Sequence, residues 1–443
     1  MDVVHHGGHE GVTGSCHELV ISPERSLLVD CGLFQGADAK GRDEENPIDF
    51  SIEHVDTLIL THVHLDHVGR IPYLIAGGFK GPIYCSPPTA KLLPLMLEDA
   101  LRVGVTRNKR LIERFLLDLR KHIRPIPLEQ WHDIGGDVQI RLSPAGHVLG
   151  SVFVEVDHGG QRIVFSGDLG SRHQPLLKEP RSPEKADLLV LESTYGDRNH
   201  VGRDQRVEQL HRVLCRTLDN KGVTIIPAFS VGRTQELLYE MNAIFDLMSK
   251  ERRCSMLSAV DVIIDSPLAQ RFTEIYKSLQ SYWDDEAQQV LKIDDAPLVF
   301  ENLVDIENHA EHKDTVEYLK SSELPAIVIA ASGMCTGGRV VNYLKEFISD
   351  ERTDIVFVGY QARGTTGRYI QDSDWVKLDG KRYDVKAQTH QLSGYSAHAD
   401  QSDLLRFVDG MASAPSEIRL VHGEEEAKSA LRHELLERGY RVS

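Results

Sequence analysis

Short apolar runs rich in β-branched residues recur along the chain, each followed by a polar turn. Runs of this length predict buried strands, because an amphipathic helix needs a longer pattern with a period near 3.6 residues. Five of these runs lead within three positions to a side chain that can bind a metal ion: Leu27–Val29, Thr57–Leu60, Arg141–Pro144, Arg162–Phe165 and Ile418–Val421.

The middle of the chain alternates between strand and helix patterns. Three apolar runs, Val223–Phe229, Ala326–Ala331 and Ile355–Val358, each open a strand-loop-helix unit with Gly and Ser in its loop. This alternation predicts a parallel sheet with flanking helices. Elsewhere, helical periodicity covers Met96–His122, whose charges are expected to form a solvated face, and Ala427–Tyr440.

The run at Thr57–Leu60 is followed by four metal-capable side chains within six positions: His62, His64, Asp66 and His67. Alternate side chains of an extended chain point the same way, so His62 and His64 converge on one ion. Asp66 and His67 come where the chain is expected to turn into a helix, aimed at a second ion. A lone histidine is usually not a ligand, but four ligand types at this spacing predict a dinuclear metal site.

Other strand ends supply further ligands, because open α/β sheets place their ligands there. Asp168 is suited to bridge two ions, since each of its oxygens can serve one of them. Mixed nitrogen and oxygen ligands suit two zinc ions, with manganese or iron as alternatives. The expected sets are His62, His64 and His147 for one ion, and Asp66, His67 and His422 for the other, with Asp168 between them.

This pattern resembles the metallo-β-lactamase superfamily. The resemblance is carried by the signature His62-x-His64-x-Asp66-His67 and by His147, Asp168 and the strand-end Asp30. It implies an α/β fold of the αββα type, in which two β-sheets pack face to face between outer helices and the metals lie at one edge. Because this fold hosts lactamases, thioesterases, lyases and nucleases, it does not fix the function.

Three further motifs resemble those of the β-CASP nucleases: Glu192–Arg198, Ser396–Asp400 and Val421–Glu424. The resemblance covers nearly the whole chain. It implies that an inserted α/β domain, a parallel sheet flanked by helices, interrupts the lactamase domain. The expected boundaries are 1–204 and 386–443 for the two metallo-β-lactamase segments, and 205–385 for the β-CASP domain.

His422 favours RNA as the substrate. In this family the third extra motif tends to carry histidine in RNA-processing members and an apolar residue in the DNA-repair branch. The resemblance therefore implies a zinc-dependent ribonuclease, a hydrolase that processes single-stranded RNA. Endonuclease and 5′-to-3′ exonuclease modes both occur on this architecture, and the sequence leaves the choice between them open.

The catalytic roles are assigned partly from chemistry and partly from the resemblance. Asp66 and Asp168 are expected to hold the attacking water as well as the ions, and Asp30 is expected to orient a ligand histidine from behind. By resemblance, His398 donates a proton to the departing oxygen, with Glu192 hydrogen-bonded to it. The alternative is that Glu192 and His398 only pin the insertion to the core domain.

Loops of the insertion carry candidate phosphate contacts. Helix N-termini present free N–H groups, and arginine adds a forked, permanently charged donor. The alternative for each loop is a helix cap or a strand-to-helix turn. The candidates in these loops are Ser230, Arg233, Arg339, Arg363 and Arg368, and Ser396 of the closing segment is a further candidate.

The formal net charge of −17 argues against an extended groove for nucleic acid, because general nucleic-acid binders are basic over the binding face. Bound divalent ions would bring positive charge to the phosphate position itself. We therefore expect a footprint of a few nucleotides at the metal site.

The remaining composition fits a cytoplasmic hydrolase. The 6 cysteines are scattered without a Cys-x-x-Cys pair, which predicts reduced thiols. No apolar run approaches the roughly 18 to 20 residues of a membrane span, and the N-terminus lacks a signal-peptide profile. The sequence leaves both a monomer and a homodimer open.

Two rival functions remain. A small-molecule hydrolase of the same superfamily, cleaving a thioester, ester or lactone, explains the first ligand cluster but gives Glu192, His398 and the insertion no purpose. A non-catalytic RNA-binding scaffold is the second rival. Inactive paralogues lose ligands, whereas the expected ligand set is complete here.

Overall fold

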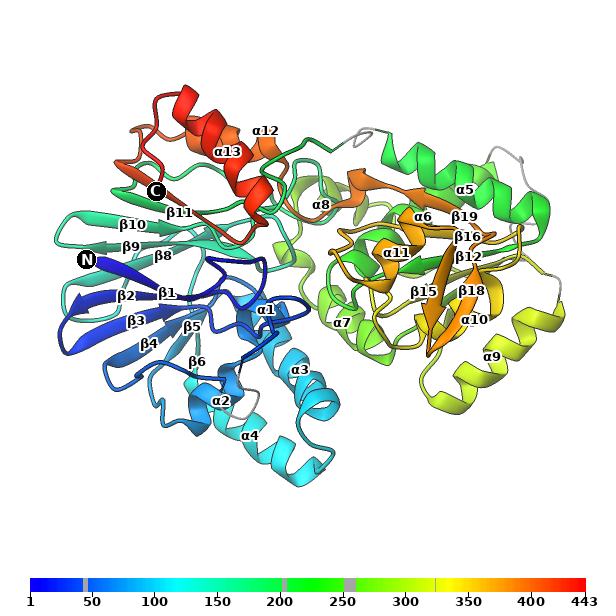
Figure 1. The fold of residues 1–443 in the computed structure, drawn as a ribbon, viewed down its shortest axis with the longest axis horizontal. Coiled ribbons are helices and arrows are strands. Elements are labelled where there is room, and N and C mark those ends of the chain that lie inside the picture. The colour runs from blue at the N-terminus through cyan, green and yellow to red at the C-terminus, as the bar shows by residue number, and fades with distance from the viewer. Residues whose placement is uncertain (43–46, 201–204, 251–259, 323) are drawn as a thin grey trace. The chain divides into compact units, whose positions relative to one another are not determined.

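The computed structural model describes residues 1–42, 47–200, 205–250, 260–322 and 324–443, and Cys254 lies outside them. The chain divides into two compact units, which Figure 1 draws as ribbons. Unit 1 comprises Met1–Asn199 and His398–Ser443, and unit 2 comprises His200–Ala397. None of the described helices is both long enough and apolar enough to cross a membrane.

Unit 1 contains two six-stranded sheets. The first is built from β1 (Asp2–Gly7), β2 (Cys16–Ser22), β3 (Arg25–Val29), β4 (Val55–Ile59), β5 (Ile83–Cys85) and β6 (Ile123–Pro125), in that order. The second has the order β20-β11-β10-β9-β8-β7. Its strands are β7 (His132–Asp133), β8 (Val138–Pro144), β9 (Val152–His158), β10 (Gln161–Phe165), β11 (Leu188–Glu192) and β20 (Glu417–Val421). The five strands predicted from apolar runs coincide with β3, β4, β8, β10 and β20 and are confirmed.

The two sheets pack face to face through one apolar core. Leu19 and Ile59 of the first sheet belong to the same buried cluster as Ile140 and Phe165 of the second. Because successive side chains of a strand point to opposite faces, Val164 of β10 turns away from this core and joins a second cluster on the outer face. The sandwich expected from the resemblance is confirmed.

Helices cover the outer faces of both sheets. α12 (Gln401–Asp409) and α13 (Glu425–Glu437) bury Leu404 and Leu431 against the outer face of the second sheet. The other helices of unit 1 are α1 (Leu65–Val68), α2 (Ile71–Ala76), α3 (Pro87–Gly104) and α4 (Lys109–His122). α3 packs on α4 and contacts β6, and Figure 1 shows both helices on the side of β4 to β6.

The helical periodicity predicted as one segment, Met96–His122, belongs to two helices. α3 ends at Gly104, and α4 begins at Lys109 behind the cap residue Asn108, whose side chain accepts hydrogen bonds from two backbone N–H groups of the first turn. A side-chain cap of this kind satisfies donors that a continuous helix would have paired internally. The apolar period runs through the break because the two helices bury the same side of the hairpin.

Unit 2 is built on a parallel six-stranded sheet of order β14-β13-β15-β12-β16-β19, with a separate antiparallel pair β17-β18. The strands are β12 (Val223–Pro227), β13 (Asp261–Asp265), β14 (Leu303–Asp305), β15 (Ala326–Ala330), β16 (Asp354–Phe357), β17 (Trp375–Leu378), β18 (Lys381–Asp384) and β19 (Gln388–Gln391). The α-helices are α5 (Arg206–Asn220), α6 (Arg233–Lys250), α7 (Pro267–Lys277), α8 (Asp285–Val290), α9 (His309–Ser322), α10 (Val340–Phe347) and α11 (Thr366–Asp372). α5, α7 and α10 pack on β12, β13 and β15, so the predicted parallel sheet with flanking helices is confirmed.

The predicted domain boundaries at 204/205 and 385/386 differ from the edges of the compact units. At the second boundary the difference has a physical reason. β19, which follows residue 386, pairs in parallel with β16 and is therefore the edge strand of the sheet of unit 2. The chain returns to unit 1 only at His398.

The core between the sheets of unit 1 is expected to dominate its stability. Leu142 of β8 is fully buried in that core, so Leu142→Ala should lower the free energy of unfolding by about 2 to 5 kcal/mol. Denaturant titration would measure the loss. Leu436→Ala, at a leucine of α13 that is 51% exposed, is the matched control and should change the same quantity by less than about 0.5 kcal/mol. Equal effects of the two substitutions would contradict this assignment of the core.

Candidate metal centre

The four-residue signature spans the short turn after β4, which carries His62 and His64, and α1, which carries Asp66 and His67. β4 ends at Ile59, and α1 begins at Leu65 with Asp66 in its first turn. The segment after β3 holds this helix in place, because the N–H of Cys31 donates to the carbonyl of His67. Gly32 passes so close that a Cβ there would lie 1.6 Å from the carbonyl oxygen of Asp66. Only glycine fits at that crossing.

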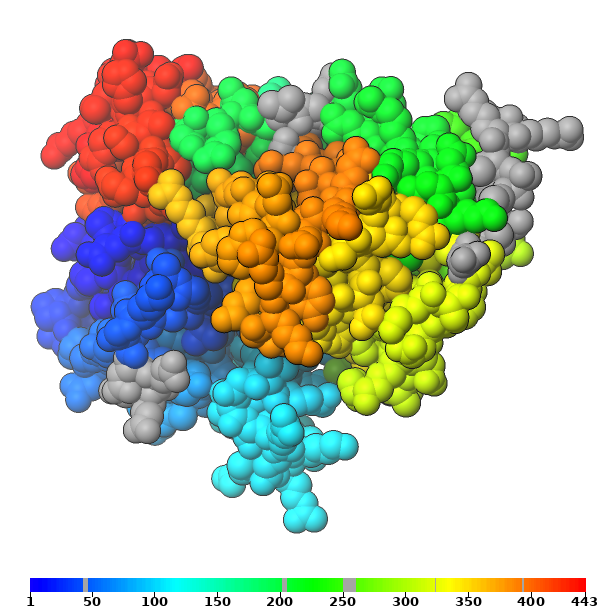
Figure 2. Space-filling view, turned by 45° about the vertical axis from the view of Figure 1, so that its right-hand side comes forward, coloured from blue at the N-terminus to red at the C-terminus, as the bar shows by residue number. Residues whose placement is uncertain are grey.

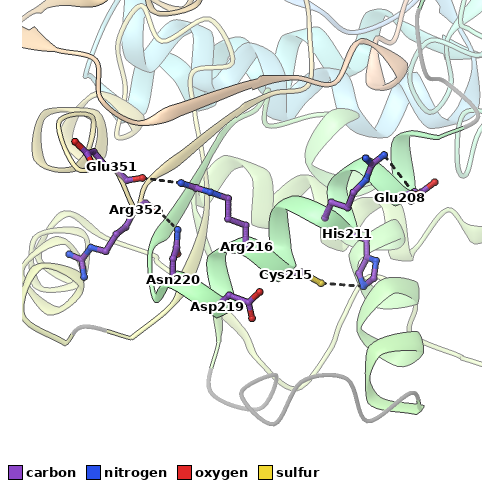
Figure 3. A pocket seen from close by; sticks show the side chains of 9 residues that line it. Glu208, His211, Cys215, Arg216, Asp219, Asn220, Glu351 and Arg352 are labelled. Atoms are coloured by element: carbon purple, nitrogen blue, oxygen red, sulfur yellow. Dashed lines mark hydrogen bonds and ion pairs between the residues drawn. The ribbon is translucent and has the colours of Figure 1, made fainter.

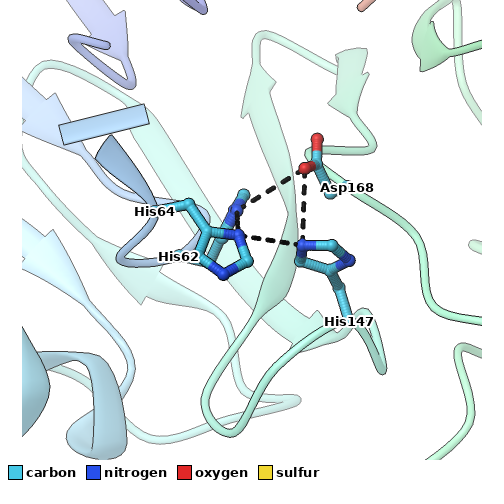
Figure 4. Close-up of side chains that lie close together, drawn as sticks. All are labelled: His62, His64, His147 and Asp168. Carbon is cyan, nitrogen blue, oxygen red and sulfur yellow. Dashed lines mark hydrogen bonds and ion pairs between the residues drawn. The ribbon is translucent and has the colours of Figure 1, made fainter. Parts of the chain in front are cut away.

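The first group of converging side chains contains His62, His64, His147 and Asp168, whose donor atoms all lie within 4.8 Å of one another. Figure 4 shows the three rings turned toward each other and toward the carboxylate of Asp168. Nδ1 of His64 lies 3.1 Å from Nε2 of His62 and 3.0 Å from Nε2 of His147. Oδ2 of Asp168 lies 3.6 Å and 3.5 Å from those same Nε2 atoms.

The second group contains Asp66, His67 and His422. Nε2 of His67 lies 3.2 Å from Nε2 of His422, and Oδ2 of Asp66 lies 3.5 Å from the latter nitrogen. Oδ1 of Asp168 lies 3.2 Å from Nε2 of His67 and 3.4 Å from Nε2 of His422. The two oxygens of Asp168 therefore face different groups, the arrangement expected of a bridging carboxylate.

These donor sets fit divalent cations. Two nitrogens bound about 2.0 to 2.1 Å from one tetrahedral ion lie about 3.3 to 3.4 Å apart, close to the separations of 3.0 and 3.1 Å around His64. A neutral imidazole has a single N–H, so three ring nitrogens that face one another have few hydrogen bonds to share. Oδ1 of Asp168 is buried without a hydrogen bond of good geometry to any described residue. A cation satisfies all of these acceptors at once.

The electrostatics divide the histidines into two classes. Burial, with the help of neighbouring imidazoles, lowers the pKa of His62 and His147 well below its ordinary value, and burial lowers the pKa of His64 to about 4. These three rings are neutral and present lone pairs. Burial also disfavours a charge on His422, but the carboxylates of Asp168 and Asp66 prevail and raise its pKa to about 9. Protons therefore compete with metal at this ring, and binding a cation releases them.

Asp30 lies behind the second group, as the sequence predicted. Its Oδ2 lies 2.7 Å from Nδ1 of His67, on the opposite side of the ring from the nitrogen that faces Asp168. Thr61 donates to the same carboxylate through its backbone N–H at 2.8 Å and its hydroxyl at 2.6 Å. A carboxylate that accepts the outer N–H of a ligand histidine fixes its tautomer and ring orientation.

A third group brings together Asp168, Glu192 and His398. Nδ1 of His398 lies 3.4 Å from Oε2 of Glu192 and 3.8 Å from Oδ2 of Asp168. Glu192 is fully buried and accepts hydrogen bonds from the N–H of Leu169 at 2.6 Å and from the hydroxyl of Thr194 at 2.7 Å. His398 is thus held between two carboxylates while its side chain keeps 18% of its exposure.

The sequence did not single out two threonines of this centre. Thr194 lies between the second and third groups, because its hydroxyl is 3.1 Å from Nδ1 of His422 as well as bonded to Glu192. Thr61 has the corresponding place behind the first groups, between Asp30 and Nδ1 of His62 at 3.1 Å. Each lies two positions after the end of a strand, which is the one signal that could have found them.

The candidate phosphate residues all belong to unit 2, and the structure ties several of them to partners there. Arg233 is buried and forms an ion pair with Glu236 one turn along α6, and Arg339 donates to Asp265. These contacts favour the structural alternative for both arginines.

Of the other candidates, two have a partner residue in unit 2 and two are described by their exposure alone. Arg368 pairs with Asp372 at 2.7 Å, and Ser230 lies 3.0 Å from the hydroxyl of Ser266. Arg363 is exposed and Ser396 is buried. Their role in phosphate binding stays a prediction.

A hollow of about 800 Å³ on unit 2 is lined by residues of α5 and by Glu351 and Arg352. Figure 3 shows contacts among several of the lining residues, including Arg216 with Glu351 and Cys215 with His211. Arg216 forms an ion pair with Asp354 and donates to the carbonyl of Glu351 at 2.9 Å, and Sγ of Cys215 lies 3.5 Å from Nε2 of His211. Among the described residues, those that line the hollow form no group of side chains that could hold a metal ion, unlike those at the centre of unit 1.

Removing the carboxylate behind His67 is expected to weaken metal binding without unfolding the chain. Asp30→Asn keeps an acceptor for Thr61 but weakens the bond that orients His67, so the affinity for a divalent cation should fall about 10- to 100-fold. Competition with a fluorescent chelator would measure it. His173→Ala, at an exposed histidine of the same unit, is the control and should leave the affinity at the wild-type value. Equal affinities of the Asp30 variant and the wild type would refute the orienting role.

Three family models match the chain. The metallo-β-lactamase superfamily model matches residues 12–219, the β-CASP domain model residues 234–370, and the model of the Zn-dependent metallo-hydrolase RNA specificity domain residues 382–443. A solved structure of a protein of unknown function from Enterococcus faecalis has a TM-score of 0.57 and 13% identity, over 99% of this chain and 96% of that one. It supports the fold alone.

Curated relatives cover the whole chain. A ribonuclease of Thermus thermophilus is 36% identical over 100% of this chain and 98% of its own length. The transcription termination factor FttA of Methanocaldococcus jannaschii is 32% identical over 95% of this chain and 66% of its own length, so the chain spans about two thirds of that relative. FttA of Pyrococcus abyssi is 32% identical over 84% of this chain. The chain therefore belongs to the β-CASP family of the metallo-β-lactamase superfamily, and these matches indicate a metal-dependent hydrolase of the nuclease type.

Proposed function

We propose that this protein hydrolyses phosphodiester bonds of single-stranded RNA at a dinuclear zinc centre. The observation that carries the proposal is the continuous donor set, in which Asp168 faces one group of three histidines with one oxygen and a second group with the other. The His398–Glu192 pair stands beside the same carboxylate. A small-molecule hydrolase has no need of that pair, and an inactive scaffold has no need of the complete set.

The proposed ligands are those expected from the sequence. His62, His64 and His147 would hold one ion, Asp66, His67 and His422 would hold the other, and Asp168 would stand between them. The mixture of imidazole and carboxylate donors suits zinc, although manganese or iron(II) would fit the same donors. The chemistry that such ions supply when bound is a lowered pKa for water and positive charge opposite the phosphate oxygens.

The side chains of the centre take the remaining roles. Asp66 and Asp168 accept hydrogen bonds from the attacking water and orient it. His398 donates its proton to the departing sugar oxygen through Nε2, because Nδ1 faces Glu192. Glu192 keeps that imidazole aligned, and its own position is fixed by Leu169 and Thr194.

RNA is proposed as the substrate on two grounds. The model of the RNA specificity domain matches the segment that contains His398 and His422, and the relative covered over 98% of its length is named a ribonuclease. We also propose that Arg363, Ser230 and Ser396 contact phosphates of the RNA. The scattered thiols fit a reducing cytoplasm as the site of action.

The first test compares the wild type with His67→Ala on a single-stranded RNA labelled internally and at its 5′ end, with and without chelator. Internal fragments from the wild type alone identify an endoribonuclease, whereas mononucleotides released from the 5′ end identify an exonuclease. Loss of His67 and chelation should each reduce cleavage to background, since both remove metal from the second group. No cleavage by a fully metallated wild type would refute the proposal and favour the small-molecule hydrolase.

The second test concerns the proton donor. His398→Ala should lower kcat about 10²- to 10⁴-fold, the usual contribution of a general acid, with metal content unchanged and KM little affected. Glu192→Gln should also lower kcat, because the amide aligns the imidazole of His398 less firmly than the carboxylate does. His433→Ala, at an exposed histidine of α13, is the control. A loss of no more than a few-fold in His398→Ala, with metal intact, would exclude the acid role.

A further inference from the structure

The hairpin formed by the end of α3, the turn and α4 has a charge opposite to that of the whole chain. Residues 102–124 contain eight arginines and lysines against two carboxylates, a net charge of +6, whereas the rest of the chain carries −23. All eight basic side chains are exposed. They are Arg102, Arg107, Lys109, Arg110, Arg114, Arg120, Lys121 and Arg124. We call these residues the basic hairpin; Figure 1 shows its helices in unit 1, and Figure 2 shows α4 at the surface, in cyan.

Several of the cations occupy positions that are unfavourable for the stability of α4. Lys109 and Arg110 occupy the first turn of α4, which contains no acidic residue, and Arg107 precedes the cap. The N-terminal end of a helix carries partial positive charge, so cations there are unfavourable. Arg110 and Arg114 are also spaced i,i+4, and like charges at that spacing destabilise a helix. The positive potential of the hairpin therefore persists at the expense of helix stability.

Most of these charges have no internal partner. Arg102 pairs with Glu98 and Lys121 with Asp118. The other cations of α4, and Arg107 before it, form no ion pair with any residue that the structure describes, in contrast to Arg233 and Arg339 of unit 2. An exposed and uncompensated cluster of this kind is available to an external anion.

The cations form a row, whereas the exposed apolar residues do not form a face. At 100° per residue, Arg110, Arg114 and Lys121 fall within about 40° around the axis of α4 and span about 16 Å. The exposed Leu111 and Leu117 lie about 120° apart around the same axis. A docking helix for a protein groove or a bilayer needs a continuous apolar stripe, which α4 lacks on its solvent side. The row suits a line of phosphates better than an apolar partner.

The basic hairpin is connected to the metal centre through α3. At the N-terminal end of α3, the hydroxyls of Ser86 and Thr89 donate to the carbonyl of Gly150, at 2.6 and 3.1 Å, in the loop that carries His147. α3 has 18 residues and spans about 27 Å, so the turn of the hairpin, with Arg107, Lys109 and Arg110, lies about that far from the contact with Gly150. At about 3.4 Å per stacked nucleotide, this separation corresponds to roughly eight nucleotides.

We propose that the basic hairpin is an accessory RNA-binding surface, which holds the phosphate backbone of the substrate without sequence preference about eight nucleotides from the bond to be cut. The inference rests on the proposed function for the identity of the anion. In a chain that otherwise repels polyanions, this hairpin gives RNA a local attractive surface on the unit that carries the metal centre. The footprint of a few nucleotides expected from net charge alone then describes the metal centre and not the whole protein.

The test reverses the charge of four cations of the basic hairpin and, separately, of a matched control set. The hairpin variant carries Arg107→Glu, Lys109→Glu, Arg110→Glu and Arg114→Glu. The control variant carries Lys292→Glu, Lys313→Glu, Lys377→Glu and Lys381→Glu, four exposed lysines of unit 2, and has the same formal charge. Circular dichroism should show both variants folded, since acids in the first turn of α4 favour the helix.

Binding is measured by fluorescence anisotropy with metal-loaded full-length chains that also carry His398→Ala, on oligouridylates of 6 and 30 nucleotides. We expect the hairpin variant to lose at least tenfold of its affinity for the 30-mer relative to the control. The ratio of 30-mer to hexamer affinity should fall with it. The slope of log affinity against log salt should decrease by roughly three, since each phosphate contact to a single strand contributes about 0.7.

Two outcomes would overturn the inference while the proposed function stands. In the first, the hairpin variant binds the 30-mer as the control does. In the second, RNA affinity is retained but self-association seen in the wild type by sedimentation velocity is lost, which makes the hairpin a protein interface. Cleavage of both RNAs is measured in parallel with His398 present. Absence of cleavage by the metal-loaded wild type refutes the proposed function, whatever the hairpin binds.

Discussion

The metal centre of unit 1 is organised around the enclosure of one carboxylate by four imidazoles. Asp168 is 2% exposed, and its oxygens lie 3.2 to 3.6 Å from the rings of His62, His67, His147 and His422. So many polar atoms can be removed from water only if each has a partner. Strand ends provide the rigidity, because β4, β8, β10 and β20 each deliver one or more of these side chains from a buried sheet. The two sheets therefore hold the side chains of a small polar cavity in fixed positions at their edge.

The charge balance of the centre follows from the same enclosure. Four carboxylates surround the rings: Asp66 and Asp168 among them, and Asp30 and Glu192 behind them. Two divalent cations would neutralise these four charges with the histidines uncharged. Without cations the neutralising charges are protons, and the carboxylates accordingly raise the pKa of His67 well above its ordinary value against the effect of burial. The outer acids are held in turn by Thr61 and Thr194, so a continuous network reaches from each β-sheet core to the metal positions.

Sequence reasoning found the inner residues because they obey local rules. An apolar run that stops at His62 or Asp168 is visible without any knowledge of the fold, and so is the spacing that places Asp66 beside His67. Partners that are distant in sequence are not visible in this way. The sequence could not show, for example, that Arg339 contacts Asp265, 74 positions earlier. The segment of β19 was assigned to the returning metallo-β-lactamase domain, because its pairing with β16 in the sheet of unit 2 cannot be seen from the sequence. The charged residues of the basic hairpin were visible in the sequence, but the sequence could not show that most of them form no ion pair.

The order of the centre along the chain has a consequence for how the protein is made. His398 and His422 follow the whole of unit 2, whereas every other residue of the centre precedes it. A nascent chain folds from its N-terminus as it leaves the ribosome, so the sandwich can assemble most of its strands while β20 is still untranslated. During that interval the second group of donors lacks His422, and His398 is absent as well. The centre is therefore incomplete until the segment that contains both residues emerges, and a chain that terminates before it lacks them permanently.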